Sequence, residues 1–162
     1  MATGDTLCVF LPLQDEPTTT NMATIDFRNA HPVLDFDDTT AESAVWTGVV
    51  PRNYAGGGWT VYVHSAATSA TSGTIGWTVE IERIGTAQDT DSDSFAGAQT
   101  ITAATVSGTS GIVTIGNVAI TDGANIDSVA VGEAFRIRVK RDVANDNAVG
   151  DAELFAVEIK ET

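Results

Sequence analysis

The run WTVYVH at residues 59–64 and the run TIGWTVEIERI at residues 74–84 decide the fold of this chain. In both runs, large apolar residues alternate with polar ones, a period of two that is typical of a β-strand with one buried and one solvated face. Four apolar residues of the second run share one face: Ile75, Trp77, Val79 and Ile81. We therefore expect Trp59 and Trp77 in the core, and Tyr62 on the opposite, exposed face of its strand.

Similar short patterns recur along the chain, separated by turns rich in Gly, Pro, Asn and Asp. We expect further strands over residues 6–11, 23–28, 33–36, 45–50, 100–106, 112–115, 118–120, 135–140 and 153–160. The runs 112–115 and 118–120 are either two strands or one strand with a bulge at Gly116-Asn117. Residues 124–131 have room for one short helical turn. In the last strand, three residues are expected to face inward: Phe155, Val157 and Ile159.

Eight to ten short strands without a convincing long helix indicate an all-β, antiparallel β-sandwich. A jelly roll is the best-fitting layout for so many strands in one domain. An immunoglobulin-like sandwich is the alternative, although the Cys-Trp-Cys spacing of its true members is absent. We expect one domain over residues 1–162, with an extended N-terminal segment over residues 1–22.

Charge and targeting signals narrow the class of partner. Asp and Glu number 22 against 8 Lys and Arg, a net charge of -14 that disfavours nucleic acid and anionic membranes as partners. The N-terminus lacks the basic and apolar regions of a secretory signal, and no apolar run approaches ~20 residues. We expect synthesis in a cytoplasm.

Cys8 lies in an apolar run and reads as a small buried hydrophobe rather than a reactive thiol.

The acidic run DTDSD at residues 89–93 is the most tempting site motif. Its carboxylates, Asp89, Asp91 and Asp93, have the spacing with which a calcium loop begins. An EF-hand would continue with Gly and Glu where this chain has Ser94 and Thr100, so that interpretation fails. An irregular calcium site and a solvated acidic loop both stay open, with the solvated loop as the default.

Other residues with catalytic potential have simpler explanations. His31 precedes a proline in an expected turn, and His64 is adjacent to Ser65 on a strand, where neighbouring side chains point to opposite faces. The triple glycine at residues 56–58 lacks the following Lys of a phosphate loop and indicates a turn. We therefore predict no enzyme activity, and no catalytic, cofactor-binding or metal-binding residue.

The basic residues near the C-terminus form a charge pattern. Arg136, Arg138 and Lys140 share the polar face of one strand, and Arg141 follows them. We expect this group to pair across strands with four carboxylates, namely Glu80, Glu82, Glu153 and Glu158. The first pair that we expect is Arg136 with Glu80. A second pattern, of aromatic residues, would suit a sugar-binding platform if it were exposed: Trp46, Tyr54, Trp59, Tyr62 and Trp77.

Several segments carry a resemblance to known proteins: GDTL at 4–7, HPVLDFD at 31–37, GVVPRNY at 48–54, ATSATSG at 67–73, GEAFR at 132–136, GDAEL at 150–154 and VEI at 157–159. Over nearly its whole length the chain resembles a poorly characterised family of small tailed-bacteriophage structural proteins, similar to jelly-roll capsid decoration (cement) proteins. The resemblance implies no catalytic residues.

What the resemblance implies is a non-enzymatic virion protein that decorates and stabilises a capsid. The expected form is a homotrimer at three-fold or quasi-three-fold positions on the outer capsid surface, with the major capsid protein of the same phage as partner. The alternative is a receptor- or carbohydrate-binding head domain of a phage tail fibre. The connection Ser65–Gly73, rich in Ser and Thr, is where a contact with capsid or sugar is expected first.

Overall fold

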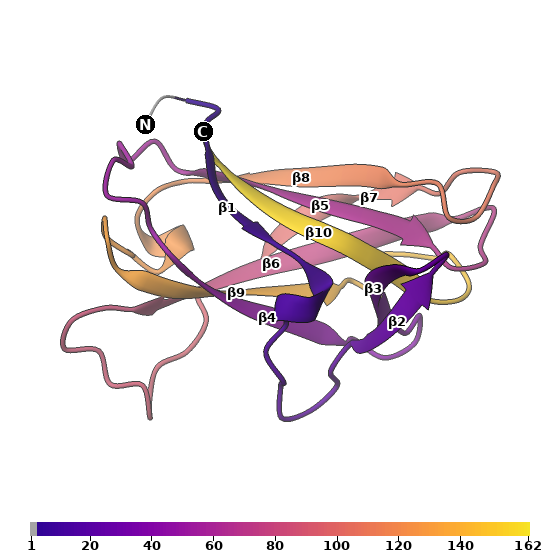
Figure 1. The fold of residues 1–162 in the computed structure, drawn as a ribbon, viewed down its shortest axis with the longest axis horizontal. Coiled ribbons are helices and arrows are strands. Elements are labelled where there is room, and N and C mark those ends of the chain that lie inside the picture. Colours follow the sequence, from indigo (N-terminus) through magenta and orange to yellow (C-terminus); the bar gives the residue numbers. More distant parts are fainter. Residues whose placement is uncertain (1–2) are drawn as a thin grey trace.

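The computed structural model describes residues 3–162, and ten strands there form two antiparallel sheets packed face to face (Figure 1). The strands are β1 (Thr6–Phe10), β2 (Thr24–Arg28), β3 (His31–Phe36), β4 (Ser43–Val49), β5 (Trp59–Ala67), β6 (Thr74–Ile84), β7 (Gln99–Thr105), β8 (Thr114–Ile120), β9 (Ala134–Arg141) and β10 (Ala152–Glu161). The predicted antiparallel β-sandwich of jelly-roll type, with eight to ten strands, is confirmed.

The two sheets differ in size and share no strand. The six-stranded sheet has the order β2-β3-β10-β5-β8, and β1 also pairs with β10. Because β1 and β3 pair with different halves of β10, they occupy the same edge of it one after the other. The four-stranded sheet has the order β4-β9-β6-β7. Its outer face carries the candidate functional site.

The space between the sheets is filled by the apolar faces that the alternation predicts. Trp46, Trp59 and Trp77 are each at most 2% exposed, which confirms the core positions expected for Trp59 and Trp77. The Trp77 ring meets the Phe36 ring edge-on at 4.9 Å between centroids, and Trp59 lies 4.8 Å from Phe135. With all three tryptophans buried, they cannot form an exposed sugar platform.

Two details of strand geometry differ from expectation. β8 is one strand in unbroken register with β5, so the bulge proposed at Gly116-Asn117 is wrong. Gly116 is required for another reason, because a Cβ there would lie 2.8 Å from a methyl carbon of Ile101. The irregularity falls instead in β10, between Leu154 and Ala156. It turns Phe155 out of the core, so the expected inward position of Phe155 is wrong.

Short 3-10 turns complete the fold. η2 (Ala124–Ile126) lies within the helical turn expected over residues 124–131, whereas η1 (Pro12–Gln14) was not foreseen. His31-Pro32 belong to β3 rather than to a turn, because the turn before them is made by Asn29 and Ala30, both at positive φ. Within residues 3–162, no helix is long and apolar enough to cross a membrane.

Candidate functional site

Three cations project from the outer face of the four-stranded sheet. Along β9, Arg136, Arg138 and Lys140 alternate with residues that are fully buried, as the sequence predicts. β6 lies beside β9 in a register that sets Glu80 opposite Arg138 and Glu82 opposite Arg136. The expected charge ladder therefore exists on this face.

The pairing within the ladder differs from the prediction. Arg136 bonds Glu82 at 3.0 Å and Glu16 at 3.2 Å, so the predicted Arg136–Glu80 pair is wrong. Glu80 instead accepts from Arg138 at 2.6 Å and contacts Lys140 at 3.0 Å. Two other predicted members lie on the six-stranded sheet, where Glu153 pairs with Arg28 and Glu158 with Thr6.

Arg141 also does not belong to this ladder. It is the next inward-facing position of β9, and its side chain is fully buried. The guanidinium bonds Asp146 and three backbone carbonyl oxygens, those of Phe36, Ala148 and Gly150. Arg141 therefore anchors the loop between β9 and β10 and is not available to a ligand.

The three partly exposed cations of β9 form the floor of a hollow of about 380 Å³. One wall is the segment 17–21, which is held against β4 by the bridges Glu16↔Val45 and Met22↔Ser43. Phe95, from the connection between β6 and β7, contributes another wall. The lining is mostly polar, with hydroxyl, amide and cationic groups: Thr18, Thr19, Thr20, Asn21, Ser43, Arg136, Arg138 and Lys140. We call this site the β9 hollow.

The cations of the β9 hollow are more exposed than the carboxylate with which two of them pair. Burial raises the pKa of Glu80, but the hydrogen bonds and charges of Arg138 and Lys140 outweigh burial and hold that pKa below its usual value. The Glu80 side chain is 12% exposed, against 27% for Arg138 and 31% for Lys140. The Arg138 guanidinium also lies 4.0 Å from the Phe95 ring centroid. The hollow thus offers hydrogen-bond donors rather than an open aromatic face.

The outer face of the six-stranded sheet is the second exposed polar surface. Tyr62 and His64 lie on it, half-buried, as their position in the strand predicts. The Lys160 ammonium sits 5.7 Å from the Tyr62 ring centroid and so covers one face of the ring. This surface therefore offers less for sugar stacking than an uncovered aromatic residue would.

The triple glycine makes the predicted turn. Gly56 and Gly58 have positive φ, and a Cβ on Gly58 would lie 2.7 Å from the carbonyl oxygen of Ile120. Tyr54, beside this turn, donates its hydroxyl proton to Asp122 and accepts from the amide of Gly58, both at 2.9 Å. Burial, together with the bond to Asp122, raises the pKa of Tyr54 to about 12. These bonds secure the turn.

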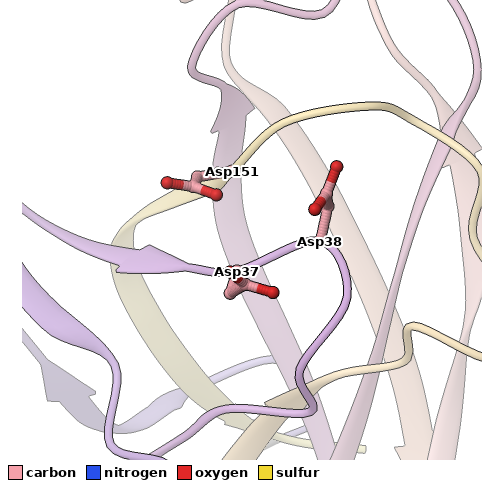
Figure 2. A group of neighbouring side chains, drawn as sticks. All are labelled: Asp37, Asp38 and Asp151. Carbon is pink, nitrogen blue, oxygen red and sulfur yellow. The ribbon is translucent and has the colours of Figure 1, made fainter.

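Three carboxylates converge at the ends of β3 and β10, namely Asp37, Asp38 and Asp151 (Figure 2). Oxygens from the three lie within 4.8 Å of one another. Hydrogen bonds from Thr39 and Thr40 lower the pKa of Asp37 to about 2, and Asp38 accepts from the amide of Gly150. The group offers three ligand atoms, whereas Ca²⁺ takes about six to eight oxygens.

The other sequence candidates lie apart from these surfaces. Asp89 and Asp91 are exposed and Asp93 is half-buried, and among residues 3–162 their carboxylates do not converge on one point. His31 is exposed at the start of β3. Cys8 is half-buried and burial raises its thiol pKa, as suits an unreactive thiol. Of the connection Ser65–Gly73, residues 65–67 belong to β5.

Sequence reasoning found the cations of the β9 hollow but missed its walls. Thr18–Asn21 and Phe95 are distant from β9 in the chain, and only the packing of two connections brings them there. The convergence of Asp37 with Asp151 likewise depends on the pairing of Phe36 with Ala152. The local sequence carries no signal for either juxtaposition.

Comparison with known proteins bears on the fold. No protein-family profile and no curated protein sequence matches this chain. Among solved structures it is similar to the module "CBM35 from Cellvibrio japonicus Abf62", with a TM-score of 0.57 and 10% identity over 94% of this chain and 91% of that one. A family 35 carbohydrate-binding module from an environmental isolate matches with a TM-score of 0.56 and 12% identity, covering 95% and 93%.

A third structure extends the same likeness. The CBM22-2 xylan-binding domain of Paenibacillus barcinonensis Xyn10C matches with a TM-score of 0.52 and 12% identity, covering 92% of each chain. At these identities the likeness shows a shared fold. The sandwich of this chain is thus that of several carbohydrate-binding modules.

Proposed function

We propose that this protein is a non-enzymatic carbohydrate-binding module that binds a glycan in the β9 hollow. The observation that carries the proposal is the hollow itself, a concave site of about 380 Å³ lined by convergent polar side chains on a rigid sheet. Hydroxyl, amide and guanidinium groups suit the many hydroxyls of a sugar. The three structural relatives with carbohydrate-binding modules in their names support the proposal through the fold alone.

A glycan-array screen followed by calorimetry tests this proposal, with Arg138→Met as the site variant. Met keeps much of the aliphatic stem and removes the donors, so we expect at least tenfold weaker binding. Arg83→Met is a matched control, because Arg83 is 28% exposed against 27% for Arg138 and pairs with Glu133 outside the hollow. Equal glycan affinity in the Arg138 and Arg83 variants, or no bound glycan at millimolar concentration, would contradict the proposal.

We propose capsid decoration as a second candidate function, because β1, η1 and β2 carry several exposed apolar side chains. β1 and β2 both lie near the viewer in Figure 1. Five large apolar residues of β1, η1 and β2, with the one residue between β1 and η1 included, are 50–64% exposed: Val9, Leu11, Leu13, Ile25 and Phe27. β2 is an edge strand that pairs only with β3 within residues 3–162, so its outer edge is open to another chain.

This second candidate is a homotrimer bound to the major capsid protein of a phage, on the outer surface of the head. Light scattering checks the trimer, and a reconstruction of the particle locates the protein. We expect Phe27→Asp to weaken self-association or particle binding and to leave glycan binding in the β9 hollow unchanged. Density at the tail tip rather than on the head would rule out decoration.

A further inference from the structure

The charges around the β9 hollow are unevenly distributed. Arg138 and Lys140 share one carboxylate, that of Glu80, at 2.6 and 3.0 Å. At the other end of the floor, Arg136 has two carboxylate partners, Glu82 and Glu16. One positive charge is therefore in excess at the Arg138–Lys140 end, and one negative charge is in excess at the Arg136 end.

The donors at the positive end are also incompletely used. Arg138 bonds Glu80 through Nε, which leaves its two terminal nitrogens as donors within the part of the chain described, residues 3–162. Phe95 packs against the guanidinium and limits its rotation. A guanidinium held in one plane presents a fork of N–H groups that matches the two oxygens of a carboxylate.

We propose that the β9 hollow selects an acidic glycan, and that the Arg138–Lys140 pair binds a carboxylate carried by a sugar ring. This inference rests on the proposed carbohydrate-binding function and adds the ligand class. Thr18, Thr19, Thr20 and Asn21 also line the hollow, and their hydroxyl and amide groups would bond the neutral hydroxyls of the same ligand. A ligand carboxylate at this end neutralises the one positive charge that Glu80 leaves uncompensated.

The net charge of -14 opposes an anionic ligand at long range. At about 0.15 M salt this repulsion is screened beyond about 8 Å, whereas two cations in contact with the ligand act within that distance. Glu80, the nearest carboxylate, already accepts from both cations and lies below them. Selection for acid is thus a contact effect, and it is best measured at physiological salt.

The test compares tetragalacturonate with its methyl ester, because esterification removes the charge and keeps the sugar backbone. We expect calorimetry at 0.15 M salt to show at least tenfold tighter binding of the acid. Lys140→Met should abolish most of this preference, measured as the ratio of the affinity for the acid to the affinity for the ester. Lys160→Met removes a cation from the other sheet and serves as the control, with the preference retained.

The outcomes separate this inference from the function on which it rests. Equal binding of acid and ester by the unmodified protein overturns the acidic-glycan inference and leaves carbohydrate binding standing. Binding of neither, together with an empty glycan array, overturns the proposed function itself. Tighter binding of pentaglutamate than of tetragalacturonate overturns the inference in favour of an acidic protein segment.

Discussion

Replacing Arg141 by methionine should destabilise the fold strongly, although this residue ends a strand whose other cations are partly exposed. Its side chain is 0% exposed, and its partner Asp146 is 2% exposed. The guanidinium lies 2.8 Å from Asp146, 3.1 Å from the carbonyl of Phe36, 2.8 Å from that of Gly150 and 3.0 Å from that of Ala148. Methionine preserves volume and removes every one of these bonds.

The magnitude follows from what is left behind. Breaking a buried ion pair by removing one partner costs about 3–5 kcal/mol, because the other charge stays buried and uncompensated. We expect a loss of about 4 kcal/mol for Arg141→Met, against a total stability of about 5–15 kcal/mol for a typical domain. Adding Asp146→Asn should recover about 1–2 kcal/mol by removing the orphaned charge.

Urea denaturation followed by tryptophan fluorescence measures both effects, since all three tryptophans are buried. Arg138→Met is the control. Its pair with Glu80 is partly exposed, and such pairs contribute about 0–1 kcal/mol. A loss below about 1.5 kcal/mol for Arg141→Met, or no recovery on adding Asp146→Asn, would refute the reasoning that this buried network anchors the β9–β10 loop.

Three further predictions concern single side chains. Burial, with the nearby charge of Glu153, raises the pKa of Asp35 from 3.8 to about 6. Between these two pH values the folded state binds more protons than the unfolded state, so the free energy of unfolding falls as the pH rises. Asp35→Asn should therefore gain about 1–2 kcal/mol at pH 7, after allowance for solvent screening, and flatten the urea-measured slope between pH 4 and 6; an unchanged slope would contradict this. Gly48→Ala should lower stability by about 1–3 kcal/mol in thermal denaturation, since its Cβ would lie 2.7 Å from Phe135; an unchanged Tm would show that the ring moves aside freely. The raised pKa of Cys8 should make its labelling at pH 7.4 slower than that of the unfolded chain, and equal rates would show an open thiol.

The strands were predictable because alternation is a local property. β5, β6 and β9 each show a period of two over six residues or more, and their buried faces follow from it. Arg141 shows the limit of the same rule. Its place on the inward face of β9 follows from alternation, but its charge suggested the solvated face, and only Asp146 and three carbonyls make burial tolerable.

The candidate site was predictable only in part. The sequence placed Arg136, Arg138 and Lys140 on one solvated face, but the identity of each partner depends on the register of β6 against β9. A shift of two residues would have made the predicted Arg136–Glu80 pair. The hollow further requires two connections to fold over this face, and their path is set by contacts far along the chain.

The place of β10 in the six-stranded sheet has a consequence for biosynthesis. β10 is the last of the ten strands to leave the ribosome, yet β1, β3 and β5 all pair with it. Until it emerges, β1 and β3 lack their shared neighbour, and β5 has only β8 beside it. This sheet therefore assembles after translation of the domain, so a nascent chain stalled before residue 152 should remain sensitive to protease and dependent on chaperones.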